Sequence, residues 1–306
     1  MVEELLALAA DRPAGVDRFG LRTTVSAGSQ WLRLNARVAG LALTGKWVTP
    51  REVARGYDRV AGTYNEAWQR RLRPVTDTFM ARLPGGLAGT ILDLGCGTGY
   101  TTAILAVRNP EATIHGVDIS AGMLKAAGSA GDSRVKFIQN DMLEYLQSAR
   151  EGSARMVVST WALGYSHPAK LIAECHRVLQ AGGAFGFVVN YFDTLAPVFR
   201  AFQGCMLRFP ERVQRAAWPR FPRTWASLES PLRRAGFRID WHADGREKIT
   251  PPEDSLLAWL KQTGILAGFD AMLELSGPAA EWFEAELRRE AGNIYHHYAA
   301  VVAAKP

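Results

Sequence analysis

Short apolar runs alternate with amphipathic segments between residues 90 and 192. Apolar runs of four to eight residues bounded by turn residues are typical of buried strands, and a repeat of three to four residues is typical of helices. The predicted strands are 90–95, 112–120, 135–142, 154–163 and 184–192, and the predicted helices are 101–109, 121–130 and 169–183. Repeated strand–helix units of this kind predict an α/β fold, with a parallel sheet covered by helices on both faces.

The alternation stops after residue 192. Residues 193–223 are aromatic, basic and interrupted by prolines, which predicts a helical lid insertion. A helix at 224–237 and a strand at 237–245 follow, and a second predicted lid covers about residues 250–290. The apolar run at 294–305 predicts the last strand.

The first 50 residues read as short helical pieces and are interpreted as an N-terminal helical extension. Residues 29–43 form an amphipathic pattern in which Leu32, Val38 and Leu41 are separated by arginines. We expect this helix to pack on its own protein, and peripheral contact with a membrane or a partner is the alternative.

Three aromatic residues precede the first strand. Tyr57, Tyr64 and Trp68 are spaced by seven and then four positions, which places them on one helix face if the helix is continuous. Gly56 and Gly62 interrupt that stretch.

The segment ILDLGCGTGY, residues 91–100, carries the candidate chemistry. Gly95, Gly97 and Gly99 follow the first strand and open the next helix, at the sheet edge where ligands bind in open α/β folds. Glycines there permit positive φ angles and close approach of a ligand. Asp118 follows the last of them by about 20 residues, the separation at which an acidic residue reaches ribose hydroxyls. The alternative is a tight turn followed by a surface aspartate.

The amino-acid composition limits the classes of protein that fit this sequence. A hydrophobic share of 48% and a charged share of 22% are ordinary for a globular protein. Cys96, Cys175 and Cys205 show no CxxC spacing, which argues against a zinc knuckle or a disulfide framework and favours a reducing cytoplasm. The acidic N-terminus is a poor signal peptide, and no apolar stretch has the roughly 20 residues of a membrane span. The formal charge of +6 is compatible with an acidic substrate or simply with an arginine-rich surface.

ILDLGCGTGY resembles motif I of the class I S-adenosylmethionine (SAM)-dependent methyltransferases, and DISAGML at 118–124, QNDMLE at 139–144 and STWALGYSH at 159–167 resemble later motifs of that family. The resemblance implies a Rossmann-like seven-stranded sheet with an antiparallel last strand, and a SAM-binding domain over residues 51–306. It also implies a set of cofactor-binding residues. They are Asp93, Gly95, Cys96, Gly97, Gly99, Asp118, Ile119, Met123, Asp141, Met142 and Ser159, with Tyr57 and Tyr64 as aromatic cover. Trp161 could also offer an electron-rich face to the sulfonium.

The methyl acceptor is harder to identify, because an acceptor carboxylate needs no general base. The second lid and last strand resemble carboxyl methyltransferases acting on trans-aconitate or a malonyl-carrier protein, which implies a small acidic or aromatic acceptor, free or on an acidic carrier protein. A quinone C-methyltransferase, an RNA methyltransferase and a non-catalytic SAM-binding partner protein are the alternatives. No RNA-binding module is recognised and no carboxylate set for a metal ion is found, so neither nucleic acid nor metal is expected. His167 and Tyr64 are the catalytic candidates.

Lid arginines would suit an anionic acceptor, since guanidinium groups bind carboxylates in a bidentate manner. They are Arg200, Arg208, Arg212, Arg215, Arg220 and Arg223. A solvated basic face is the alternative interpretation.

Overall fold

The computed structural model describes residues 24–128, 132–217, 220–252 and 256–306. Its centre is a seven-stranded sheet in the order β3-β2-β1-β4-β5-β7-β6. The strands are β1 (Gly89–Leu94), β2 (Ala112–Asp118), β3 (Val135–Gln139), β4 (Ala154–Thr160), β5 (Leu179–Asn190), β6 (Arg238–Lys248) and β7 (Tyr295–Ala304). Only β7 runs antiparallel to its neighbours β5 and β6. The seven-stranded Rossmann-like fold that the resemblance implies is therefore confirmed.

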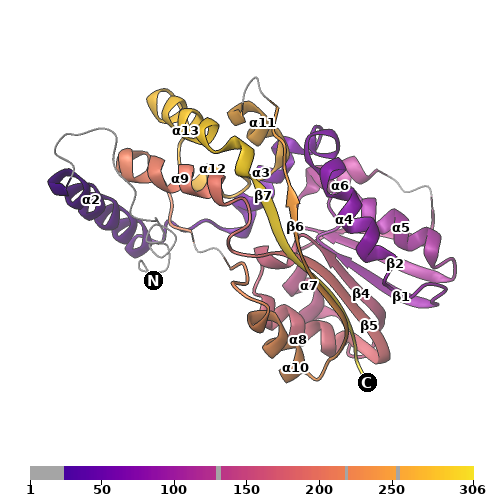
Figure 1. Cartoon of the computed structure of the whole chain (residues 1–306). Coiled ribbons are helices and arrows are strands. Elements are labelled where there is room, and N and C mark those ends of the chain that lie inside the picture. The colour runs from indigo at the N-terminus through magenta and orange to yellow at the C-terminus, as the bar shows by residue number, and fades with distance from the viewer. Residues whose placement is uncertain (1–23, 129–131, 218–219, 253–255) are drawn as a thin grey trace.

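Helices cover both faces of this sheet (Figure 1). On one side lie α4 (Arg70–Met80), α5 (Tyr100–Arg108) and α6 (Ala121–Ala127), and on the other lie α7 (Met142–Ser148), α8 (Pro168–Val178) and α10 (Ala226–Ala235). Alternate residues of β1 supply the two cores, because successive strand side chains point to opposite faces. Ile91 packs with α4 and α5, whereas Leu92 and Leu94 pack with α7 and α8.

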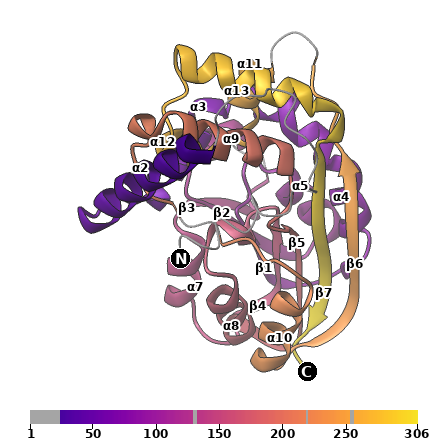
Figure 2. The same ribbon diagram turned by 60° about the vertical axis from the view of Figure 1, so that its left-hand side comes forward.

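A third core lies beyond the carboxyl ends of the parallel strands, under the lid helices α9 (Ala196–Arg208), α11 (Leu256–Thr263), α12 (Phe269–Met272) and α13 (Pro278–Arg289) (Figure 2). These helices fall within the two predicted lids, and the domain division at residue 50 stays a prediction. Residues 1–23 of the predicted extension lie outside the described residues, as do residues 218–219 of the first predicted lid and 253–255 of the second.

The helix α2 (Thr24–Leu43) extends away from the sheet in Figure 1. Leu34 and Leu41 are buried in the lid core, and Val38 packs against it. The expected packing of this helix on its own protein is thus confirmed, but Leu32 is on its outer side and 74% exposed. No described helix combines the length and apolar character needed to cross a membrane.

Several element boundaries differ from the prediction. The strand predicted at 154–163 ends at Thr160, and the strand predicted from residue 184 begins at Leu179. The helix predicted at 169–183 ends at Val178, because Leu179 already pairs with Ala154 of β4 and the backbone N–H of Gly182 donates to Lys305. The strand predicted at 135–142 ends at Gln139. Sheet hydrogen bonds to neighbouring strands override local helix propensity after Val178.

Candidate active site

The glycine-rich segment forms the turn between β1 and α5. The N–H groups of Gly95 and Cys96 donate to the Val117 carbonyl at 2.7 and 3.1 Å, which fastens the turn to β2. Gly95, Gly97 and Gly99 all have positive φ, of 71°, 54° and 81°. The predicted need for glycine in this turn is therefore met by backbone geometry at each position.

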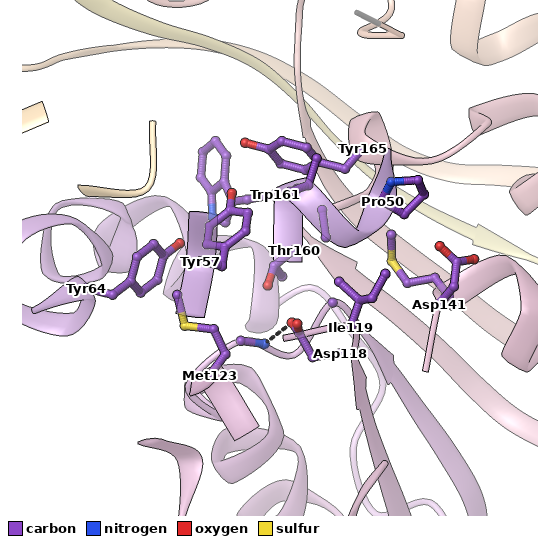
Figure 3. Close-up of a pocket in the computed structure, with 15 residues that line it drawn as sticks. Pro50, Tyr57, Tyr64, Asp118, Ile119, Met123, Asp141, Thr160, Trp161 and Tyr165 are labelled. Carbon is purple, nitrogen blue, oxygen red and sulfur yellow. Dashed lines mark hydrogen bonds between the residues drawn. The ribbon is translucent and has the colours of Figure 1, made fainter. Parts of the chain in front are cut away.

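The two pocket-facing glycines of the turn face different surroundings. A Cβ added to Gly95 would lie 2.2 Å from Cβ of Ala162, so this glycine permits β1 and the segment after β4 to touch. A Cβ added to Gly97 would meet nothing within 4 Å. Gly97 therefore borders open space, and it lines the pocket shown in Figure 3.

Asp118 closes the same turn from the end of β2. Its Oδ2 accepts the N–H of Gly97 at 2.8 Å, and its Oδ1 accepts the N–H of Ser120 at 2.9 Å. Burial raises the pKa of Asp118, while these two backbone bonds lower it and the nearby Asp58 raises it. Asp118 lines the pocket between Ile119 and Met123, as Figure 3 shows.

Asp141 and Met142 also line this pocket. Asp141 caps α7, because its Oδ1 accepts the N–H groups of Leu143 and Glu144 at 2.8 and 3.2 Å. This short helix was not predicted from the apolar pattern, although an aspartate cap was its available signal.

An aromatic layer covers the pocket. Tyr57 lies on α3 (Pro50–Val60), Tyr64 in the following turn, and Tyr165 in the short 3-10 helix η2 (Leu163–Tyr165). The ring of Tyr57 contacts those of Tyr64 and Tyr165 edge-on, with centroids 6.1 and 5.8 Å apart. Burial raises the pKa of all three phenols, so they keep their protons at neutral pH.

The continuous helix considered for Tyr57, Tyr64 and Trp68 is not present. The helix α3 ends at Val60, and a π-helix, η1 (Asn65–Gln69), begins after Tyr64. Tyr57 and Tyr64 nevertheless meet at the pocket, whereas Trp68 packs against Trp259 and His296 in the lid core.

Asp58, which the sequence analysis did not single out, links helix α3 to the segment that follows β2. Oδ1 of Asp58 accepts the hydroxyl of Ser120 at 2.6 Å and the N–H of Gly122 at 2.8 Å. A Cβ added to Gly122 would lie 2.9 Å from Cα of Asp58, so the two backbones are in close contact. These bonds hold α3, which carries Tyr57, against the segment that follows β2.

Four predicted cofactor residues lie behind the pocket rather than on its lining. Asp93 is fully buried and accepts the Thr102 hydroxyl at 2.6 Å. The Ser159 hydroxyl donates to the Leu94 carbonyl at 3.0 Å and so joins β4 to β1. The Cys96 side chain lies against Gly116 of β2. Gly99 likewise packs inward, since a Cβ there would lie 3.2 Å from Phe137.

The buried carboxyl of Asp93 is of further interest, because its Oδ1 has no hydrogen-bond partner among the described residues. Burial raises the pKa of Asp93 to about 7, the Thr102 hydroxyl lowers it, and the charge of Asp118 raises it. An unpaired carboxyl oxygen behind the glycine turn fits a cationic ligand group, reached directly or through water.

His167 is not brought to the pocket. It occupies the N-cap position of α8, because η2 turns the chain so that Tyr165 faces the pocket instead. Desolvation lowers the pKa of His167, and the charges of Arg220 and Lys170 lower it further. Its predicted catalytic role thus has no support from its position.

The end of β4 and the residues after it also reach the pocket; of these, only Trp161 was considered for the site from the sequence, as a possible aromatic face toward the sulfonium. Thr160, Trp161 and Ala162 all line the pocket. Trp161 has a φ of 66°, a left-handed conformation that non-glycine residues seldom adopt. Its indole N–H donates to the Thr76 hydroxyl at 3.0 Å, which fixes the ring between the pocket and the lid core.

A second cavity adjoins the first. Both are lined by Pro50, Val53 and Tyr165. The other residues lining the second cavity are Trp47, Val48, Thr49, Gly164, Ala217, Arg220, Phe221, Ala267, Gly268 and Phe269. Arg220 is thus the one charged residue of this lining, among the residues that the structure describes.

Most of the other lid arginines are engaged within the protein. Arg200, Arg212 and Arg215 pair with Glu290, Glu274 and Glu52. Arg223 lies over the ring of Phe192 at 4.8 Å. The broad basic face is therefore largely an intramolecular network, and Arg220 stands apart because it lines a cavity.

Comparisons with known proteins identify the family of this chain. Residues 91–183 match a family described as "Methyltransferase domain". Trans-aconitate 2-methyltransferase of Methylobacterium nodulans is 43% identical over 69% of this chain and 81% of its own length. Malonyl-[acyl-carrier protein] O-methyltransferase of Laribacter hongkongensis is 35% identical over 50% of this chain and 54% of its own. The chain thus spans about half the length of that relative.

Among solved structures, the [4+2]-cyclase SpnF superposes with a TM-score of 0.55 at 20% identity, covering 84% of this chain and 97% of that one. A likeness at this identity supports the fold alone, since one fold hosts different chemistries. The family follows instead from the M. nodulans relative together with motif I, its positive-φ glycines and Asp118. The chain belongs to the class I SAM-dependent methyltransferases.

Proposed function

We propose that this protein transfers the methyl group of SAM to the carboxylate of a small acidic acceptor. The observation that carries this proposal is the second cavity, whose apolar lining contains Arg220 and which shares a wall with the glycine-turn pocket. Arg220 is exposed, and a guanidinium group beside an otherwise uncharged cavity lining suits a carboxylate. The relatives named as trans-aconitate and malonyl-carrier-protein methyltransferases support the same acceptor class.

The pocket beside the glycine turn is the proposed SAM site. Asp118 would accept the ribose hydroxyls, and Gly97 would let the ligand approach the backbone. Asp141 and Met142 would border the adenine, and the unpaired Oδ1 of Asp93 suits the cationic amino end. Bound SAM supplies a methyl group activated by its sulfonium. The tyrosine layer would exclude water and offer electron-rich rings to that cation.

The lining of the proposed SAM site contains no histidine, lysine or cysteine among the described residues. Tyr64, a catalytic candidate, is a neutral phenol here and is proposed to position and shield rather than to remove a proton. A carboxylate acceptor requires only alignment and a dry site, which the lid and the tyrosines provide.

The affinity for SAM is expected to rise as the pH increases through about 7, because the ionised Asp93 carboxyl, whose pKa is raised to about 7, attracts the cationic cofactor better. The raised pKa of Asp93 has the opposite effect on the stability of the protein without SAM, which decreases as the pH rises. Asp93 is protonated in the fold while ionised in the unfolded chain, so its contribution to stability falls between about pH 4 and pH 7.

Calorimetric titrations between pH 5.5 and 8.5 would check this expectation, with Asp93→Asn as the variant that removes the ionisation. The variant should show a flatter pH profile. A profile of equal slope in both proteins would contradict the placement of Asp93 at the cationic end.

Replacing Arg220 by methionine is expected to raise KM for an acidic acceptor roughly tenfold, because a hydrogen bond to a charged group is lost. Affinity for SAM should stay unchanged, since Arg220 does not line the glycine-turn pocket. Arg212→Met is the matched control, because Arg212 pairs with Glu274 and does not line the second cavity. Equal KM values in wild type and Arg220→Met would argue against the acceptor cavity.

The reaction itself is tested by incubating the protein with methyl-labelled SAM and a cell extract. Label in small molecules that mild base releases would support a carboxyl ester, and base-labile label on a protein would support a carrier-bound acceptor. Base-stable label in small molecules would refute carboxyl methylation and favour the quinone-type alternative. Label in RNA would favour the nucleic-acid alternative.

A further inference from the structure

His296 occupies a buried position next to the proposed SAM site. It lies at the start of β7, whose first residues adjoin the carboxyl ends of the parallel strands. The side chain is 2% exposed. The imidazole packs between Trp161, at a centroid distance of 5.3 Å, and Trp68, at 4.9 Å. Since Trp161 lines the proposed SAM site, one aromatic ring separates His296 from that pocket.

One side of the imidazole is held by a polar network. Nδ1 of His296 lies 2.9 Å from Oδ1 of Asn190 and 3.2 Å from the Thr194 hydroxyl. That hydroxyl accepts the N–H of His297 at 3.1 Å and reaches Oδ1 of Asn190 at 3.4 Å. An amide oxygen only accepts, so Nδ1 carries the proton and donates to Asn190. This contact fixes the tautomer and leaves a lone pair on Nε2.

The Nε2 atom of His296 is buried and has no hydrogen-bond partner among the described residues. The indole N–H of Trp259 is a second buried group in that state, and its ring also packs on Trp68, with centroids 5.8 Å apart. An unpaired acceptor and an unpaired donor thus border the same tryptophan ring. Buried polar groups without partners are uncommon in folded proteins and point to a ligand or water.

The protonation state of the His296 imidazole limits the ligand groups that it can bind. Burial lowers the pKa of His296 to about 3, so the ring is neutral and offers no positive charge to a carboxylate. A carboxylate has no proton to donate and would be repelled by the Nε2 lone pair. A hydroxyl group can donate to Nε2, and it can equally accept from an indole N–H.

We propose that His296 is a specificity-determining residue that accepts a hydrogen bond from a hydroxyl group of the methyl acceptor. This proposal rests on the proposed function and names its substrate class as hydroxylated carboxylic acids. The carboxylate receives the methyl group. His296 does not line the second cavity, so it would recognise the hydroxyl at the end of the acceptor that lies against Trp161, which lines the proposed SAM site. The tryptophans around His296 favour an acceptor with an apolar or aromatic body.

Two pairs of acids test the proposal, 3-phenyllactate against 3-phenylpropanoate and malate against succinate. Each pair differs only by one hydroxyl. Turnover is measured with SAM, and acid binding is measured separately by calorimetry in the presence of S-adenosylhomocysteine. The wild-type protein is expected to prefer the hydroxylated member of at least one pair by about tenfold, the effect of one hydrogen bond.

The variants separate recognition from structure. His296→Asn keeps an N–H that can donate to Asn190 but lacks an acceptor at the Nε2 position, so the preference should fall to near one. His296→Gln can place an amide oxygen near the Nε2 position and should retain part of the preference. His297→Gln is the matched control, because His297 pairs with Asp193 and adjacent strand residues point to opposite faces.

The outcomes are distinguishable. A preference that is lost in His296→Asn and kept in His297→Gln supports the proposal. If His296→Asn lowers turnover or binding of both acids equally, His296 is structural and the proposal is overturned. Binding preference without turnover would support His296 as the recognition residue and refute carboxyl methylation. A wild-type preference near one in both pairs overturns the hydroxyl assignment while turnover alone would still uphold the proposed function.

Discussion

Replacing Asp118 by alanine is expected to raise the dissociation constant for SAM by roughly tenfold to a hundredfold, the equivalent of about 1.5–3 kcal/mol for a hydrogen bond to a charged group. Asp118 carries the one carboxylate at the end of β2 that both organises the glycine turn and lines the pocket. Removing it deletes the proposed acceptor for the ribose hydroxyls. It also releases the N–H groups of Gly97 and Ser120.

Because the alanine change affects both the ligand contact and the turn, Asp118→Asn serves as the matched variant. Its amide oxygen can still accept one backbone N–H, so the turn should persist while the charge is lost. Titration calorimetry measures affinity, and thermal unfolding without SAM measures the turn. Asp132→Ala is a control, because Asp132 pairs with Arg134 and lies outside the pocket lining. Unchanged affinity in Asp118→Ala would show that the ribose site is elsewhere.

An alanine substitution at Gly95 is expected to reduce the stability of the fold, whereas one at Gly97 is expected to reduce the affinity for SAM. At Gly95 the added Cβ would lie 2.2 Å from Cβ of Ala162, in backbone that already has a φ of 71°. Left-handed backbone costs an alanine about 1–2 kcal/mol, and the steric clash adds to that. Gly95→Ala should therefore lower the unfolding temperature by more than about 5 °C, since each 1 kcal/mol shifts Tm by roughly 2–4 °C in a chain of this size class.

At Gly97 an added Cβ meets no protein atom, so only the backbone cost applies to folding. The methyl group would instead occupy space at the pocket where the ligand is proposed to approach the turn. Gly97→Ala should remain folded yet bind SAM at least about tenfold more weakly, the effect of losing roughly 1.4 kcal/mol. Calorimetry and thermal unfolding on both variants check the contrast, and a Gly97→Ala protein with wild-type affinity would disprove the proposed approach.

Local sequence signals were sufficient for the sheet's first half. The apolar runs ending at Leu94 and Asp118 and the glycine spacing depend on backbone rules that act within a few residues. For that reason β1 and β2 were predicted to within two residues of their observed ends, with the turn and Asp118 between and after them. The start of β5 at Leu179 was not, because this segment pairs with Ala154 of β4 and exchanges hydrogen bonds with Lys305, which follows the last strand and is more than a hundred residues away.

The composition of the site was predictable only in part. The predicted residues that do line the pocket lie at or near strand ends, or on and just after α3. They include Asp118, Ile119, Met123, Asp141, Met142, Tyr57 and Tyr64. Tyr165 was missed as a lining residue, and Trp161 was predicted only as one of three aromatic residues that could face the sulfonium. Whether a residue after β4 faces the pocket depends on η2 and on the left-handed backbone of Trp161, which no periodicity reveals.

The sequence by itself determined the class of fold, the glycine turn and its acidic partner, since these follow from hydrophobic periodicity and from the steric freedom of glycine. Only the tertiary structure decided that His167 lies apart from the pocket and that His296 lies beside it. His296 meets Trp161 and Asn190 because β7 inserts next to β5, which brings residues more than a hundred positions apart into contact. Contacts of this kind depend on strand order and burial, which local sequence patterns do not encode.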